Sequence, residues 1–366
     1  MTKKLNFIRQ HILDLPAYQP IFPLDVLAEE LGIDKNQLNK LDANENPFGP
    51  LPEVKEVLSE IDSYHIYPDP ESRQIRNLLA EHHNLPQECI VIGAGADELI
   101  DLIMRIVLDP GDKIVNCPPT FGMYAFDGLL NRAEVISIPR NPDFSLNLPA
   151  LISAVEIYQP KLMFLANPNN PDGSTISEDD FVQLVNLPIL LVIDEAYIQF
   201  SDPGQTLIPQ ISDYPNLIVL RTFSKWAGLA GLRIGYGVFP AEMTPVLMKA
   251  KQPYNVSVAA EAAAVITMKH LSKAEERVAK IIEQRNQLLV GLAQIPWLST
   301  YPSQANFILC KVMHRSAREV RDGLRNQGVL VRYFDKPGLS DHIRISIGTE
   351  EQNQQLLCAL KGMSKL

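Results

Sequence analysis

Lys225 and Arg233 lie in a stretch of small and apolar residues, RTFSKWAGLAGLRIGY at 221 to 236. Lysine is among the side chains that are least often buried, so an amine in this setting asks for a chemical role. One such role is Schiff-base formation with an aldehyde, which needs an unprotonated amine and therefore a lowered pKa. The alternative is a solvated surface lysine, which is the commoner case for any lysine taken alone.

Polar, aromatic or glycine-rich segments follow five of the apolar runs that we predict to be strands. In an open α/β sheet, ligands bind outside the carboxyl ends of the strands, so these segments are expected to meet in one site. They are GAGADE (93–98) after the run 89–93, PPTFGMY (118–124) after 113–117, NPNNPDG (167–173) after 161–166, DEAY (194–197) after 188–193 and TFSK (222–225) after 216–221.

Each of these segments also has a purely structural explanation. Asp194 could cap a helix or pair with a buried base. Tyr197 and Phe121 could be core aromatics, and Asn170 is typical of a turn. Independent coincidences at five strand ends are improbable, however, and this favours a shared site.

The glycine-rich segment does not match a dinucleotide fingerprint, because the third glycine of GxGxxG would fall at Glu98. What remains is a helix N-terminus whose backbone N–H groups at Ala96 and Asp97 suit a single phosphate. Pyridoxal phosphate would use every element of the set. Its phosphate would meet this turn, its ring face Phe121, its ring nitrogen Asp194, its phenolic oxygen Asn170 and Tyr197, and its aldehyde Lys225.

The elements that must position these groups follow an α/β pattern. Apolar runs at 89–93, 113–117, 134–138, 161–166, 188–193, 216–221 and 232–239 predict a mostly parallel seven-stranded sheet, covered by helices such as 97–108 and 177–186. After a long helical stretch at about 257–293, strands at 305–310, 329–333 and 342–347 and helices at 316–326 and after Thr349 predict a smaller α/β domain. We therefore expect an N-terminal arm at 1–45 that packs on the small domain or on a partner subunit, a large domain at 46–252 and a small domain at 253–366.

Composition excludes several classes of protein. The 366 residues carry a net charge of -10, which argues against a nucleic-acid surface. The four cysteines show no CxxC spacing, and the adjacent His82 and His83 lack metal-ligand spacing, so no metal site is predicted. The absence of an apolar run of about 18 residues predicts no membrane association, and a cytoplasmic protein is expected.

The segments also resemble a known family. LDANENPFGP (41–50), YPDP (67–70), GAGADE, PPTFGMY, NPNNPDG, DEAY, SKWAGLAGLRIGY (224–236) and RISIG (344–348) run in the order seen in fold-type I, pyridoxal-phosphate-dependent aminotransferases of class I/II. The lysine motif and DEAY point to the cofactor class. LDANENP, GADE and RISIG resemble the histidinol-phosphate aminotransferase branch, with an aspartate-aminotransferase-like fold.

The resemblance implies a role for each matched residue. Lys225 would form the Schiff base, Asp194 would keep the pyridine nitrogen protonated, and Tyr197 and Asn170 would hydrogen-bond the phenolic oxygen. The phosphate would be bound by the N–H groups of Ala96 and Asp97, by Ser224 and Arg233, and by Tyr67 from the neighbouring subunit. Arg344 and Arg332 would hold the anionic group of the substrate, and Tyr18 would line the partner's pocket. A homodimer with shared active sites is therefore expected.

The implied reaction is transamination of L-histidinol phosphate with 2-oxoglutarate, which gives imidazole acetol phosphate and L-glutamate in histidine biosynthesis. Phe121 departs from the tyrosine that is frequent at the ring-stacking position of this branch. An aromatic amino acid aminotransferase and a threonine-phosphate decarboxylase would keep the same cofactor residues. A cofactor-binding regulator would need a DNA-reading domain, for which 1–45 is too short. Arg332 could instead form a surface ion pair.

Overall fold

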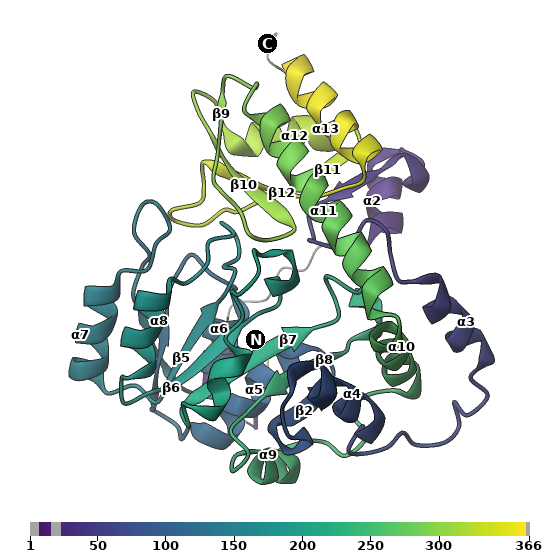
Figure 1. Ribbon diagram of the computed structural model, residues 1–366. Helices are drawn as coiled ribbons and strands as arrows, with labels where there is room; N and C mark the ends of the chain where they lie inside the picture. The colour runs from purple at the N-terminus through teal and green to yellow at the C-terminus, as the bar shows by residue number, and fades with distance from the viewer. Residues whose placement is uncertain (1–6, 16–22, 364–366) are drawn as a thin grey trace.

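The computed structural model describes residues 7–15 and 23–363, so Tyr18 lies outside the described residues. Two sheets dominate the described chain (Figure 1). The larger has seven strands and consists, from edge to edge, of β2 (Ile90–Gly93), β8 (Gly235–Val238), β7 (Leu217–Thr222), β6 (Leu190–Asp194), β5 (Leu162–Ala166), β3 (Lys113–Asn116) and β4 (Glu134–Ser137).

In this sheet, β8 alone runs against its neighbours β2 and β7, and every other adjacent pair among the described strands is parallel. The mostly parallel seven-stranded sheet that the sequence predicts is therefore confirmed. β2, β3, β5, β6 and β7 consequently end at one edge, where their five following segments converge.

Both faces of the large sheet are buried, because alternate residues of one strand enter different cores. In β6, Leu191 and Ile193 belong to one core and Val192 to the other. The helices on the side of Val192 are α5 (Ala96–Val107), α6 (Met123–Leu130) and α9 (Thr244–Ala250). The opposite core takes in α3 (Pro52–Glu60), α4 (Arg73–His83), α7 (Leu148–Tyr158), α8 (Glu178–Val185) and α10 (Val258–Lys269). A continuous apolar strand sequence needs such two-sided cover.

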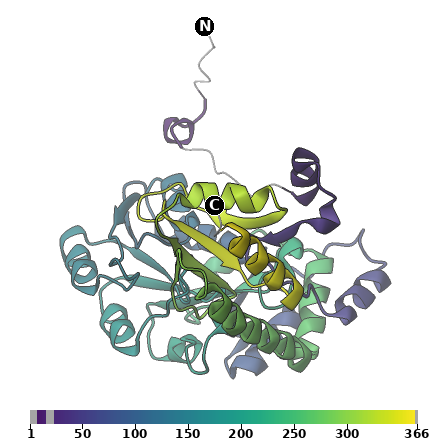
Figure 2. The same ribbon diagram turned by 90° about the horizontal axis from the view of Figure 1, so that it is seen from above.

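The second sheet has the order β1 (Asn39–Leu41), β11 (Val329–Tyr333), β12 (His342–Ser346), β10 (Phe307–Val312) and β9 (Leu298–Thr300). Its helices are α11 (Leu271–Leu292), α12 (Ala317–Arg325) and α13 (Glu350–Met363), and Figure 2 shows this layer from above. The fold class, including the smaller α/β unit, agrees with the sequence prediction. The division of the chain at residues 45 and 252 stays a prediction.

The N-terminal segment contributes to this second sheet. β1 pairs in parallel with β11, and Leu27 of α2 (Leu24–Leu31) packs with Leu38 and Leu330. A further short helix, α1 (Gln10–Leu13), precedes it.

One difference from the predicted elements is that the helical stretch at 257–293 is two helices, α10 and α11, with a break at His270. His270 has φ −114° and ψ 35°, which lies outside the α-helical region. No glycine or proline marks the break in the sequence.

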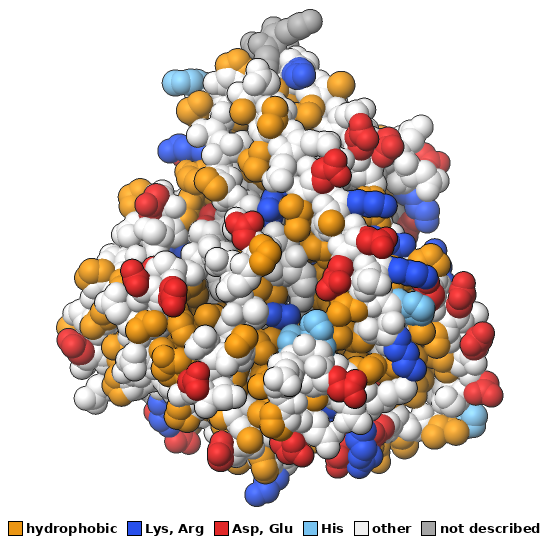
Figure 3. Space-filling model, viewed as in Figure 1, with side chains coloured by type: hydrophobic (Ala, Val, Ile, Leu, Met, Phe, Trp, Pro, Cys, Tyr) orange, Lys and Arg blue, Asp and Glu red, His pale blue; other side chains and the backbone are white. Residues whose placement is uncertain are grey.

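No helix in the described ranges is both long and apolar enough to cross a membrane. On the face shown in Figure 3, acidic and basic side chains are interspersed among hydrophobic ones.

Candidate active site

Lys225 follows β7 at the edge where the strand ends converge. Phe223, two residues earlier, is fully buried, while Lys225 itself is half-buried. The Nζ atom donates to the carbonyl of Ala43 at 3.4 Å and lies 5.9 Å from the ring centroid of Tyr197. The amine therefore points into the molecule, toward the end of β6.

Asp194 ends β6 and is 5% exposed. Its Oδ2 accepts a hydrogen bond from the hydroxyl of Tyr124 at 2.7 Å, and its Oδ1 accepts one from the Ala196 N–H at 3.1 Å. Burial raises the pKa of Asp194 to about 6, and the Tyr124 hydrogen bond opposes part of that rise. A buried carboxylate held by two donors is suited to accept a proton-bearing ring nitrogen.

The turn after Asp194 is held by a buried ion pair. Glu195 is fully buried, and its Oε2 lies 2.8 Å from the Arg221 Nη2. The other oxygen accepts from the Leu207 N–H at 2.6 Å, and Thr206 donates to Oε2 at 2.8 Å. Because the partners come from β7 and from the loop before residue 208, this pair fixes the position of DEAY against the neighbouring strand.

The segment 42–46 crosses over Lys225 from the second sheet. Asn44 donates through Nδ2 to the Tyr197 hydroxyl at 3.1 Å, and its backbone N–H donates to Ser346 Oγ at 2.8 Å. Asn46 donates to the carbonyl of Trp226 at 2.8 Å. The sequence predicts Tyr197 as a site residue. Its partner Asn44 belongs to the segment LDANENPFGP, but the sequence did not predict a role for this asparagine.

The side chain of Arg233 contacts the first turn of α5, where the predicted phosphate site would lie. Its Nη2 donates to the Asp97 carboxylate at 3.0 Å, and its Nη1 lies 3.4 Å from Ser224 Oγ. The first N–H groups of a helix have no partner within the helix, and in α5 these belong to Ala96 and Asp97. The Ser224 hydroxyl, the Arg233 guanidinium and the helix start thus form one set of donors for an anion.

Two glycines make this close approach possible. Gly95 has φ +88°, and a Cβ there would lie 2.6 Å from Arg233 Nη2. A Cβ on Gly235 of β8 would lie 2.8 Å from the Ala96 nitrogen and 2.7 Å from the Arg221 carbonyl oxygen. Side chains at either position would fill the space where the turn, the arginine and β8 meet.

Phe121 lies in the segment after β3 and packs edge-to-face on Tyr124, with ring centroids 5.5 Å apart. Tyr124, like Asn44, was given no role by reasoning from the sequence, although it stands in PPTFGMY. It is fully buried, and its hydroxyl joins the Phe121 segment to Asp194. Only the packing of α6 on the sheet reveals this contact.

Arg344 and Arg332 are directly opposite each other on the antiparallel strands β12 and β11. Residues in such a pair project from the same face of the sheet. Arg344 is buried and donates to Asn170 Oδ1 at 2.5 Å and to the Asp42 carbonyl at 2.8 Å. Arg332 is half-buried, with its guanidinium 5.7 Å from the Phe334 ring. The second sheet therefore brings the Arg344 guanidinium to the NPNNPDG segment of the large sheet, with Arg332 paired beside it on β11.

Tyr67 is not brought to this site within the chain. It is 78% exposed and stacks on Tyr254 with ring centroids 4.5 Å apart.

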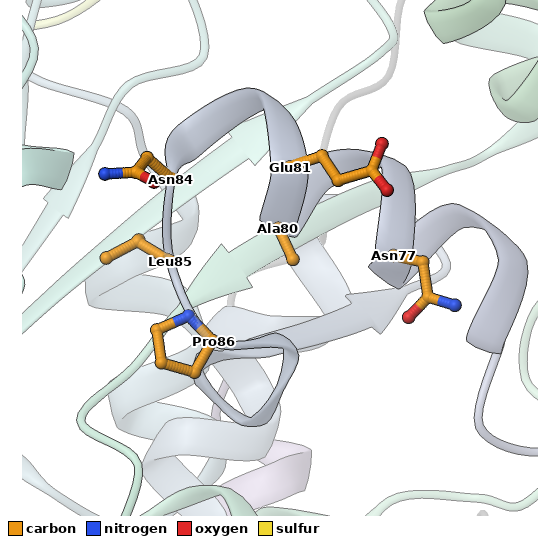
Figure 4. A pocket seen from close by; sticks show the side chains of 6 residues that line it. All are labelled: Asn77, Ala80, Glu81, Asn84, Leu85 and Pro86. Atoms are coloured by element: carbon orange, nitrogen blue, oxygen red, sulfur yellow. The ribbon is translucent and has the colours of Figure 1, made fainter.

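Other places are less suited to chemistry. In the described part of the chain, no cluster of three or more His, Cys, Asp or Glu residues could hold a metal ion. A shallow hollow at the end of α4 is open to solvent, and no residue of the five segments at the strand ends lines it (Figure 4). It is lined by Asn77, Ala80, Glu81, Asn84, Leu85 and Pro86.

Comparison with known proteins decides the family. The model of the aminotransferase class I and II family matches residues 36–360. The chain belongs to the aminotransferase class I and II family. The groups described above are those that an aminotransferase needs. They are an inward-pointing lysine, a carboxylate at a strand end and an anion site at a helix start.

Several aminotransferases are similar to this one over most of its length. Histidinol-phosphate aminotransferase 1, chloroplastic, of Arabidopsis thaliana is 50% identical over 97% of this chain and 85% of its own. The histidinol-phosphate aminotransferase of Dehalococcoides mccartyi strain BAV1 is 45% identical over 100% of both chains. Among solved structures, histidinol-phosphate aminotransferase from Sinorhizobium meliloti, in complex with pyridoxal-5'-phosphate, superposes with a TM-score of 0.90 at 27% identity, covering 99% of this chain and 100% of that one.

Proposed function

We propose that this aminotransferase uses pyridoxal 5'-phosphate to transaminate L-histidinol phosphate with 2-oxoglutarate, giving imidazole acetol phosphate and L-glutamate in histidine biosynthesis. The observation that carries the substrate assignment is the 45% identity over the full length of both chains to a histidinol-phosphate aminotransferase. The site geometry supports it independently, since one set of anion-binding groups lies at the start of α5 and a buried arginine, Arg344, contacts Asn170.

The residues present fit this cofactor. The donors at the start of α5, Ser224 and Arg233 would hold its phosphate, in the space that a Cβ on Gly95 would fill. Asp194 would hold the ring nitrogen, and the Phe121 ring would cover one face of the pyridine ring. Tyr197 and Asn170 would hydrogen-bond the phenolic oxygen. When bound, the cofactor supplies an aldehyde carbon that exchanges amines and a ring that accepts the electron pair of a broken Cα–H bond.

The chain's own groups have distinct tasks in the reaction. Lys225 Nζ would take the proton from Cα of the amino donor and later return it, acting as general base and then general acid. Asp194, as a carboxylate, would hold a proton on the ring nitrogen and so favour electron flow into the ring. Burying Asp194 beside Tyr124 keeps water from competing for that proton.

Arg344 and Arg332 would bind the anionic group of each substrate in turn. A planar guanidinium fork suits both phosphate and carboxylate. Because Arg344 already contacts Asn170, substrate binding and the cofactor's phenolic oxygen would share one hydrogen-bonded set.

Further assignments extend beyond one chain. We propose a cytoplasmic homodimer with shared active sites, in which Tyr67 of one subunit reaches the cofactor phosphate of the other and Tyr18 lines the partner's substrate pocket. The exposure of the Tyr67 ring supports a role outside its own chain. We also propose that 46–252 and 253–366 act as two domains, with 1–45 as the arm.

A panel of amino donors tests the substrate assignment. Purified protein with pyridoxal phosphate and 2-oxoglutarate should give a kcat/KM for L-histidinol phosphate that exceeds those for phenylalanine and tyrosine. The ratio should be on the order of tenfold or more, because an unpaired anion site is costly to leave empty. A higher value for the aromatic amino acids would favour an aromatic aminotransferase. Cofactor binding without transamination of any donor would favour a regulator.

A further inference from the structure

Glu98 lies in the first turn of α5 and binds two groups through one oxygen. Its Oε2 accepts the backbone N–H of Ala94 and the Nδ2 of Asn255, each at 2.6 Å. Ala94 belongs to the turn between β2 and α5 that carries the proposed phosphate donors. Glu98 therefore holds this turn through the backbone of Ala94.

Asn255 belongs to the linking segment 251–255, between α9 and α10. Its Nδ2 also lies 3.4 Å from the carbonyl of Ile92, at the end of β2. Its Oδ1 accepts from Lys251 Nζ at 2.7 Å. The side chain of Asn255 thus joins the linking segment to Ile92, before the turn between β2 and α5, and to Glu98, after it.

Lys251 anchors the far end of this chain of hydrogen bonds. It is 8% exposed, and its Nζ also donates to the carbonyls of Pro70, at 3.2 Å, and Gln252, at 3.1 Å. An ammonium group has three N–H donors, so all of them are used. Burial of an ammonium is tolerated only with such pairing.

The same linking segment holds the Tyr67–Pro70 segment at two points. Lys251 binds the carbonyl of Pro70, and Tyr254 stacks on Tyr67. In the sequence, α4 and β2 separate the Tyr67–Pro70 segment from the turn at 93–96, where the proposed phosphate donors lie. Both segments are nevertheless bound by residues of 251–255.

We propose that Glu98, Asn255 and Lys251 are positioning residues that set the phosphate-binding turn against the Tyr67–Pro70 segment. This inference rests on the proposed binding of a phosphorylated cofactor at that turn. The polar chain touches none of the reacting atoms. Its effect is expected on affinity for the phosphate group alone.

Equilibrium dialysis of the full-length protein with pyridoxal phosphate, and separately with pyridoxal, tests the proposal. Asn255→Asp keeps the oxygen that Lys251 binds but sets a carboxylate against Glu98. The dissociation constant for pyridoxal phosphate should rise about tenfold or more, as expected for losing a hydrogen bond to a charged group. The dissociation constant for pyridoxal, which lacks the phosphate, should change less than about twofold.

The matched control is Asn77→Asp, which makes the same change at an exposed position of α4 and should alter neither constant. Should Asn255→Asp fail to fold, Glu98→Ala should show the same selective loss, and Glu98→Gln, which keeps an acceptor oxygen, should recover most of it. Unchanged affinity for pyridoxal phosphate in both Asn255→Asp and Glu98→Ala, or equal losses for both compounds, would overturn the inference. A wild-type protein that binds neither compound would overturn the proposed function and this inference with it.

Discussion

At the scale of single residues, the buried carboxyl group of Asp194 makes the stability of the protein depend on pH. Its carboxyl group is buried at the end of β6, and burial raises its pKa from the ordinary 3.8 to about 6. The folded protein without cofactor therefore holds this proton more tightly than the unfolded chain does. It follows that the free energy of unfolding falls as the pH rises from about 4 to about 6, and stays low above that.

Asp194→Asn should stabilise the cofactor-free protein at neutral pH, because it removes a buried charge while an amide oxygen still accepts a hydrogen bond. The expected gain is ~2–3 kcal/mol at pH 7.5, shrinking toward pH 4, since one pKa unit corresponds to about 1.4 kcal/mol. Urea unfolding of both proteins at the two pH values measures it. The same variant should lose transamination by orders of magnitude, and equal activity would contradict the proposed role of the carboxylate.

Lys225→Ala should abolish turnover, because Lys225 supplies the amine that would form the Schiff base and move the proton. Single-turnover mixing with the amino donor measures the loss, which should exceed about a thousandfold, as for removal of a nucleophile and general base. Lys249→Ala, at an exposed position of α9, is the matched control and should retain wild-type rates. Retained activity in Lys225→Ala would refute the central assignment.

At the scale of elements, β8 is the strand that lets the phosphate turn approach the sheet. It runs antiparallel to β2 and β7, and Gly235 brings its backbone against Ala96. The apolar run 232–239 predicts a strand here, but it does not predict the direction of the strand, which only the pairing with β2 and β7 shows.

Gly235→Ala should destabilise the protein by ~1–3 kcal/mol, because the new Cβ meets backbone atoms of two segments that must both shift. It should also weaken binding of pyridoxal phosphate, since the turn at Ala96 moves with it. Thermal unfolding and cofactor titration measure the two effects. Gly231→Ala is the matched control, because no atom lies within 4 Å of a Cβ at that position, and it should be near neutral.

At the scale of the whole molecule, the site exists only where the two sheets meet. Arg344 of β12 contacts Asn170 from the large sheet, and Asn44 joins Ser346 of β12 to Tyr197. The segment 42–46 thus ties Lys225, Tyr197 and the second sheet together. Motions of one sheet against the other would change the position of the arginines relative to the lysine.

Arg344→Lys should raise KM for the phosphorylated donor by about tenfold or more while the protein stays folded, because lysine keeps the charge but loses the planar fork. Steady-state kinetics with L-histidinol phosphate measures this change. Arg325→Lys, in α12, serves as the control and should leave KM unaltered, because this arginine forms an ion pair with Glu30. A wild-type KM in Arg344→Lys would remove this arginine from the substrate site.

The sequence by itself determined the strands of the large sheet and the polar segments that follow them, and from these the proposed chemistry was predicted. Apolar runs long enough for buried strands, each followed by a polar segment, suffice for that, because parallel strands must end at one edge. It did not give the break at His270, which has no local signal, nor the partners Tyr124 and Asn44. These contacts join residues 70 and 153 positions apart, and only the packing of α6 and of the second sheet against the large one decides them.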